Sequence, residues 1–205
     1  MVPRIALICL VFGSSLGLVG PVVAAPTIGF YGDAAGTAGT LEIQAFVPAT
    51  IYLVAKGLEA DGFAVEFGAS GDLADDVDLL VLDVTGPPPI LLALDSCGRF
   101  ACLFGFGSCI AAEDPFVIAS WNVFAVADLG MDRTLCVEGF QPSTFPDGDP
   151  GYQTCDADLV AFLDATNPCG SGTPPGCLIV NPSFPCDAIP TVTRSFGAIK
   201  SLYGN

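Results

Sequence analysis

The chain has 205 residues, with 22 Asp and Glu, 6 Lys and Arg and no His, so its formal net charge is −16. The absence of histidine excludes a Ser-His-Asp triad, a Cys-His dyad and any zinc or haem site with a histidine ligand. Six cations cannot form a basic surface that neutralises phosphates, which argues against nucleic acid as a partner. The hydrophobic fraction of 52% is enough to form a core, so the acidity does not indicate disorder.

The first 24 residues have the layout of a secretory signal peptide. Arg4 gives a positive start, an apolar stretch covers residues 5–18, and small residues precede a cleavage point after Ala24. A membrane anchor is the alternative, but glycines interrupt the stretch and it is shorter than the roughly 20 apolar residues of a span. We therefore expect residues 25–205 to form one exported domain, secreted, periplasmic or at the cell surface, with no membrane span after cleavage.

Short segments with strand character follow one another along the rest of the chain. In 41–44 and 63–67 apolar and polar residues alternate, as they do in a strand with one buried face. Gly, Pro and Asp separate the segments, which is typical of an all-β domain made of two packed sheets or one closed sheet. The predicted strands are 27–31, 41–44, 51–55, 63–67, 77–84, 90–94, 102–106, 116–127, 135–139, 159–162 and 178–180.

Two of these segments are apolar enough for the interior of a sheet. Residues 77–84 are predicted to lie centrally because most of them are Leu or Val. Residues 116–127 form the longest apolar run and contain the single tryptophan, Trp121. We expect a long central strand there, with Trp121 in the core rather than on an exposed aromatic platform for sugars.

The C-terminal residues break the strand pattern. Phe196, Ile199 and Tyr203 recur at spacings of three and four residues, and Ser195 is a suitable N-cap. This spacing predicts a short C-terminal helix over 195–203, with a last strand or a frayed end as the alternative.

The predicted exported chain has eight cysteines, all from residue 97 onward. An even number of cysteines in an exported protein indicates disulfides. A thiolate metal site is the alternative, but the Cys-x-x-Cys spacing of zinc ribbons is absent from the sequence. Proximity along the chain suggests the pairs Cys136 with Cys155 and Cys169 with Cys177. The eight residues are Cys97, Cys102, Cys109, Cys136, Cys155, Cys169, Cys177 and Cys186.

Two stretches resemble known proteins. Residues 27–68, from Thr-Ile-Gly-Phe-Tyr-Gly-Asp to Gly-Phe-Ala-Val-Glu-Phe, are similar to the opening of cohesin-like and related immunoglobulin-like bacterial sandwiches. Residues 149–156 and the tail 195–203 resemble a group of uncharacterised exported bacterial proteins. The resemblance implies an immunoglobulin/cohesin-like antiparallel β-sandwich with a disulfide-rich C-terminal portion, and it supplies no activity. The cysteine-rich second half departs from cohesins, so dockerin binding is not carried over.

Two groups of aspartates are candidate calcium sites, because calcium prefers oxygen ligands. The first group is Asp72, Asp75, Asp76 and Asp78, and the second begins at Asp147 and Asp149. In the second group, Asp147, Asp149 and Asp158 fall at positions 1, 3 and 12 of a calcium-binding loop, but Tyr152 replaces the invariant glycine of that loop. Acidic turns exposed to solvent are the alternative for both groups. Calcium is the one cofactor considered. The candidate ligands are Asp72, Asp75, Asp76, Asp78, Asp147 and Asp149.

The sequence shows no residue pair that stands out as catalytic. We therefore predict a non-catalytic extracellular or cell-surface structural or binding module, with a protein or a polysaccharide as its partner. The alternative is a carbohydrate-active hydrolase that uses two carboxylates. Its candidates are Glu42, Glu66, Glu113 and Glu138, and the alternating pattern around Glu42 and Glu66 places both on the solvent face of a strand.

Overall fold

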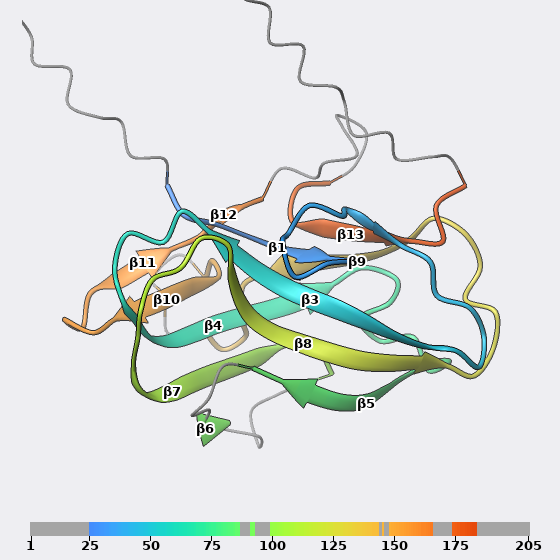
Figure 1. Ribbon diagram of the computed structural model, residues 1–205, viewed down its shortest axis with the longest axis horizontal. Helices are drawn as coiled ribbons and strands as arrows, with labels where there is room; N and C mark the ends of the chain where they lie inside the picture. Colours follow the sequence, from blue (N-terminus) through green and yellow to red (C-terminus); the bar gives the residue numbers. More distant parts are fainter. Residues whose placement is uncertain are drawn as a thin grey trace, which may run out of the picture.

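The chain folds as an all-β sandwich. The computed structural model describes residues 25–86, 91–92, 99–143, 145, 148–165 and 174–183. In these residues the regular elements are all strands, and they form two sheets packed face to face (Figure 1). The predicted signal peptide and the predicted C-terminal helix lie outside the described residues. The described residues contain no helix that is long and apolar enough to cross a membrane.

The first sheet has five strands in the order β12-β1-β3-β8-β5. Neighbouring strands are antiparallel, except that β12 runs parallel to β1. The prediction of a long central strand at 116–127 is confirmed, because β8 lies between β3 and β5. The strands are β1 (Thr27–Tyr31), β3 (Pro48–Lys56), β5 (Leu79–Thr85), β8 (Phe116–Ala125) and β12 (Leu163–Asp164).

The second sheet has the order β11-β10-β4-β9-β13-β2, and β7 pairs with both β4 and β6. Strand β4 is central: its first half lies between β10 and β7, and its last residues pair with β9. The strands are β2 (Thr40–Leu41), β4 (Gly62–Ser70), β6 (Leu91–Leu92), β7 (Cys102–Ile110), β9 (Arg133–Glu138), β10 (Gly151–Thr154), β11 (Leu159–Ala161) and β13 (Cys177–Val180).

The prediction that residues 77–84 lie centrally is wrong. Strand β5 is at the edge of the first sheet, with β8 as its only ladder partner among the described residues. Leu79 is its only fully buried residue, and Leu80 and Leu82 are exposed. Apolar content alone did not distinguish a strand buried on both faces from an edge strand that exposes part of its apolar surface.

Aromatic side chains fill the space between the sheets around Trp121. Its side chain is completely buried, as predicted, and its ring lies 5.7 Å from Phe30, 5.7 Å from Phe100 and 6.1 Å from Phe67 between centroids. Phe30 comes from the first sheet and Phe67 from the second, so the indole joins the two layers. Edge-to-face aromatic pairs add about 0.5–1.5 kcal/mol each beyond the burial of their area.

One backbone carbonyl also connects the two sheets. The carbonyl oxygen of Gly176 accepts hydrogen bonds from the N–H of Phe30 in β1 at 3.2 Å and from the N–H of Val137 in β9 at 3.3 Å. Gly176 has a φ of 70°, a left-handed conformation that glycine adopts without steric cost. Cys177, which follows directly, begins β13.

Both disulfides in the described residues involve the second sheet, one of them through the turn after β10, and their pairing corrects the prediction. Cys109 is bonded to Cys155 and Cys136 to Cys177. Cys136 and Cys177 are directly opposite each other in the β9–β13 ladder. The pairing by proximity was wrong because strand register, rather than distance along the chain, brings these residues together. Cys97, Cys169 and Cys186 lie outside the described residues, and Cys102 lies in β7.

Candidate functional site

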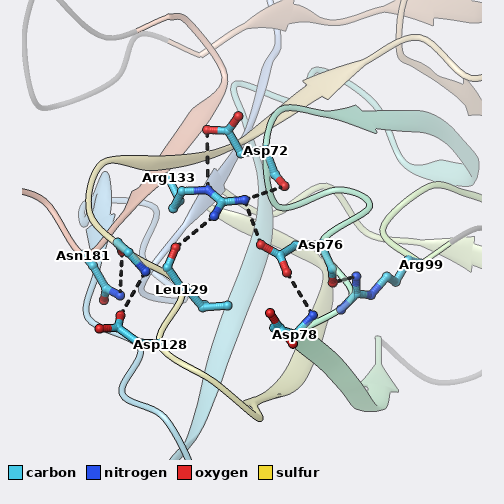
Figure 2. A network of polar contacts seen from close by, with 9 residues as sticks. Asp72, Asp76, Asp78, Arg99, Asp128, Leu129, Arg133 and Asn181 are labelled. Carbon is cyan, nitrogen blue, oxygen red and sulfur yellow. Dashed lines mark hydrogen bonds and ion pairs between the residues drawn. The ribbon is translucent and has the colours of Figure 1, made fainter.

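The first aspartate group forms a turn that is held by two arginines (Figure 2). The guanidinium of Arg133 donates to a carboxylate oxygen of Asp76 at 2.7 Å, and its Nε lies 3.7 Å from the carboxylate of Asp72. The same guanidinium donates to the carbonyl oxygens of Leu129 and Asp72. The other oxygen of Asp76 accepts the N–H of Asp78 at 2.9 Å. These contacts fix the turn between β4 and β5.

Arg99 supports the same turn from the segment before β7. Its guanidinium donates to the carbonyl oxygen of Asp76 and lies 5.8 Å from the ring centroid of Phe100. Burial lowers the pKa of Arg99, and the nearby carboxylates of Asp76 and Asp75 only partly offset this effect. The turn therefore has two cations of its own as counter-charges for its aspartates.

The predicted calcium ligands are not brought together into one cluster. Asp72 and Asp76 contact Arg133, whereas Asp75 is exposed. Asp149 lies on the other sheet, just before β10, and Asp147 is outside the described residues. In the part of the chain that the structure describes, no group of three or more His, Cys, Asp or Glu side chains could hold a metal ion. Calcium binding at these aspartates would require their carboxylates to rearrange.

The alternating pattern of 63–67 predicted that Glu66 lies on the solvent face of a strand, and this prediction is wrong. The side chain of Glu66 is only 1% exposed, and it accepts a hydrogen bond of 2.7 Å from the hydroxyl of Ser143. The β9–β10 connection, described at residues 139–143, 145 and 148–150, covers this part of the sheet. A Cβ at Gly68 would lie 2.6 Å from the carbonyl oxygen of Gly139, so the connection closely approaches β4.

The other candidate carboxylates are exposed. Glu138 lies opposite Gly68 in the β4–β9 ladder, so it shares the outer face of the second sheet with Glu66. Glu42 follows β2 and Glu113 lies between β7 and β8. The fold thus places two of the four on one sheet face, with Glu66 buried and Glu138 exposed, and leaves the other two in separate loops.

An exposed apolar surface lies at one end of the first sheet. Leu80 of β5 is opposite Phe124 of β8, and the ring of Phe46 packs edge-on against Phe124 with 6.2 Å between centroids. Val126 follows β8, and its N–H donates to the carbonyl oxygen of Asp78 at 2.8 Å. The exposed fractions are 69% for Phe46, 43% for Leu80 and 37% for Val126. We name Phe46, Leu80, Phe124 and Val126 the β5 corner; exposed Val47, Val77 and Leu82 flank it in sequence.

Phe46 holds a strained backbone conformation in this surface. Its φ is 65°, a left-handed value that is a genuine outlier for a bulky residue. Its N–H donates to the carbonyl oxygen of Ala125 at 2.8 Å, which fixes the turn against the end of β8. Strain of this kind costs about 1–3 kcal/mol and is concentrated at functional sites. An exposed phenylalanine at such a position suggests that the ring has a role outside the fold.

The side of β5 that could pair with another strand is partly blocked. The β5–β8 register shifts between Val81 and Asp83, and the carboxylate of Asp83 accepts the N–H of the neighbouring Val84 at 2.9 Å. Bulges and acidic side chains at an edge strand protect against strand addition. A partner would therefore contact the β5 corner through side chains on the face of the sheet, rather than extend its hydrogen-bonded ladder.

The charge around the β5 corner is negative. Asp75, Asp83 and Asp128 are exposed on the segments that form it. The three Lys and Arg residues in the described part of the chain already have partners: Arg99 and Arg133 bind the turn 71–78, and Lys56 donates to the carbonyl oxygen of Gly36. Of the three carboxylates, Asp75 lies near Arg99, whereas Asp83 and Asp128 have none of these three cations beside them. The corner therefore combines apolar side chains with the carboxylates of Asp83 and Asp128.

Sequence reasoning missed the β5 corner because three separate segments build it. A signal was nevertheless present in Leu79-Leu80-Val81-Leu82, four consecutive apolar residues in a strand. A strand with one buried face needs apolar residues only at alternate positions, so such a run indicates either a doubly covered strand or exposed apolar side chains.

The comparisons with known proteins give structural neighbours only. No protein-family model and no curated protein sequence matches the chain. A cohesin module from a Clostridium perfringens family 33 glycoside hydrolase is 11% identical, with a TM-score of 0.48 over 78% of this chain and 98% of the module. The sixth cohesin of Acetivibrio cellulolyticus scaffoldin B, solved with a dockerin, is 10% identical, with a TM-score of 0.47 over 77% of this chain and 99% of that one.

A Clostridium thermocellum OlpA cohesin, also solved with a dockerin, is 9% identical with a TM-score of 0.48, and covers 78% of this chain and 99% of its own. All three of these neighbours are cohesins. At these identities and TM-scores the similarity carries no conclusion about the activity or the partners of this chain.

Proposed function

We propose that the protein is a non-catalytic protein-binding module that works outside the cytoplasm, with the β5 corner as its binding surface. The observation that carries this proposal is the cluster of exposed apolar side chains around the strained Phe46. Contiguous apolar surface on a folded domain marks interaction sites more often than chance exposure of single residues. The disulfides Cys109–Cys155 and Cys136–Cys177 support an exported location, because such bonds persist in oxidising compartments.

The charge of the surface defines the kind of partner. The carboxylates around the corner attract a protein segment that carries Lys or Arg beside apolar residues. Apolar side chains of the partner would bury Phe46 and Leu80, and its cations would approach the exposed aspartates. Complementary charge would raise the association rate, while the buried apolar contacts would supply most of the affinity.

A binding experiment with a matched pair of variants tests the proposal. The chain from residue 25 to residue 205, with its disulfides formed, is titrated with a synthetic amphipathic peptide of Leu and Lys by surface plasmon resonance. We expect Leu80→Ser to weaken binding by roughly three- to tenfold, because complete burial of a leucine is worth about 1.5–3 kcal/mol and Leu80 is 43% exposed before binding. Leu159→Ser is the control, since Leu159 is a leucine of similar exposure, 51% against 43% for Leu80, on β11 in the other sheet.

The neutral substitution separates apolar contact from simple attraction between opposite charges. Leu80→Ser leaves the net charge unchanged, so a purely electrostatic complex would bind both variants as tightly as the native chain. Equal affinities for the Leu80 and Leu159 variants would therefore overturn the β5 corner as the binding surface. The same chain is also titrated with a panel of polysaccharides. Binding to a polysaccharide but not to the peptide would indicate the polysaccharide partner that the sequence analysis gave beside a protein.

A further inference from the structure

We propose that the C-terminal segment 195–203 of the same chain docks on the β5 corner and competes there with the external partner. This inference rests on the proposed function, because both use the same surface. Three features of the chain support this docking: the composition of the segment, the place where the described chain ends, and the charge of the corner.

The segment carries both cations and apolar residues, the combination expected of a partner of the β5 corner. Residues 184–205 contain Arg194 and Lys200, two of the six cations in the whole chain, and a single acid, Asp187. Between and beyond these cations, apolar residues recur at spacings of three and four: Phe196, Ile199, Leu202 and Tyr203. In an otherwise acidic protein, this is a stretch in which apolar and basic side chains occur together.

The described chain ends beside the loops that build the corner. The side-chain amide of Asn181, directly after β13, donates to the carbonyl oxygens of Ile43 at 3.1 Å and Gly130 at 3.2 Å. Ile43 precedes the turn that carries Phe46, and Gly130 follows the segment that carries Val126. In Figure 1, the end of β13 and the turn into β3 lie at the same end of the sandwich.

The linker that follows the last described residue is long. Ser183, the last described residue, is fixed by a hydrogen bond of 2.8 Å from its N–H to the carboxylate of Asp132. The chain between Ser183 and Phe196 can span up to about 40 Å when extended, which is enough to cross one end of a small domain. A tethered segment also has an effective concentration on the order of millimolar, so a weak contact is sufficient for docking.

Charge favours this occupant over a second copy of the folded domain. The exposed Asp83 and Asp128 would face the same carboxylates on another copy and repel them, whereas Arg194 and Lys200 complement them. The docked tail is therefore a built-in competitor, and an external partner must present a similar arrangement of apolar residues and cations with higher affinity.

Photo-cross-linking in the complete exported chain tests the docking directly. Phe196 is replaced by the photoreactive analogue benzoylphenylalanine, and the cross-linked products are mapped by mass spectrometry after proteolysis. We expect intramolecular links to residues 46–47, 77–82 or 124–126, with a lower yield in Leu80→Ser and an unchanged yield in Leu159→Ser. Links to another surface, an absence of links, or links between two copies would each overturn the inference.

A second measurement separates the failure of this inference from the failure of the proposed function. A tail that is docked about nine-tenths of the time weakens binding of the Leu/Lys peptide about tenfold. The double charge reversal Arg194→Glu and Lys200→Glu should therefore strengthen peptide binding by about this factor. If Leu80→Ser weakens peptide binding but the charge reversal in the tail leaves the affinity unchanged, the proposed function stands and the inference fails. If cross-links reach the corner but peptide binding ignores Leu80, the proposed function fails.

Discussion

The outer faces of the two sheets differ in what covers them. The β9–β10 connection packs on the second sheet, where it buries Glu66 and Phe145, and both described disulfides reinforce that sheet. On the first sheet, the end formed by β5 and β8 exposes Phe46, Leu80 and Val126. The second sheet also exposes Leu159, so the two sheets differ in where apolar side chains gather rather than in whether any are exposed. Under the proposed function, the covered and cross-linked sheet stabilises the fold, and the cluster on the first sheet is the part that binds.

Removal of a disulfide from the second sheet has the largest expected effect. Cys136 and Cys177 are 41 residues apart, and the chain-entropy model gives about 4 kcal/mol for a loop of this length. We expect the double substitution Cys136→Ala and Cys177→Ala to lower the free energy of unfolding by about that amount, measured by urea denaturation. The Leu80→Ser variant should be nearly unchanged in the same assay. A similar loss in both variants would show that the two sheets do not differ in this way.

Loss of the contact beneath the β9–β10 connection should have an intermediate effect. Ser143→Ala removes the hydrogen bond to the buried Glu66, and loss of one partner of a buried hydrogen bond costs about 1–3 kcal/mol. Thermal unfolding followed by circular dichroism would measure the decrease in stability. Ser108→Ala is the control, because Ser108 is exposed on β7. If the two variants unfold at the same temperature, the connection does not contribute to the stability of this sheet.

The opposite response is expected on the first sheet at Phe46. Phe46→Gly relieves the left-handed strain, so the free energy of unfolding should rise by about 1 kcal/mol. Binding of the Leu/Lys peptide should fall, because the exposed ring is lost from the β5 corner. Urea denaturation and surface plasmon resonance on the same sample would measure both quantities. A variant that is less stable and binds equally well would contradict a functional role for this ring.

Removal of calcium has the smallest expected effect. Arg133 already contacts Asp72 and Asp76, so an ion at this turn would have to displace the guanidinium. We expect the melting temperature to be the same in calcium and in a chelator. A higher melting temperature in calcium would instead support the aspartate sites that the sequence predicted, and Asp76→Asn would then show whether the first group supplies the ligands.

Sequence patterns predicted those parts of the fold that depend on neighbouring residues. The long apolar run of 116–127 placed β8 at the centre of a sheet and Trp121 in the core. Features that depend on distant segments were missed. Alternation in 63–67 placed Glu66 in solvent because the residue that covers it, Ser143, is 77 positions away. The disulfide pairing failed because it follows the register of β9 and β13.

The β5 corner could not be predicted from the pattern of residues along the sequence, for the same reason. Phe46, Leu80 and Phe124 meet only because β5 pairs with β8 and the turn before β3 bonds to Ala125. The run Leu79-Leu80-Val81-Leu82 indicated unusual apolar surface, but its exposure could be recognised only once β5 was known to be an edge strand.

The carbonyl of Gly176 has a consequence for how the domain opens. Because one oxygen accepts the amides of Phe30 and Val137, a local fluctuation that separates β1 from this point also weakens the contact to β9. The amide hydrogens of Phe30 and Val137 should therefore exchange with solvent together, as parts of one cooperative unit. Reduction of the adjacent Cys136–Cys177 bond should speed exchange at both amides, because Cys136 precedes Val137 and Cys177 follows Gly176.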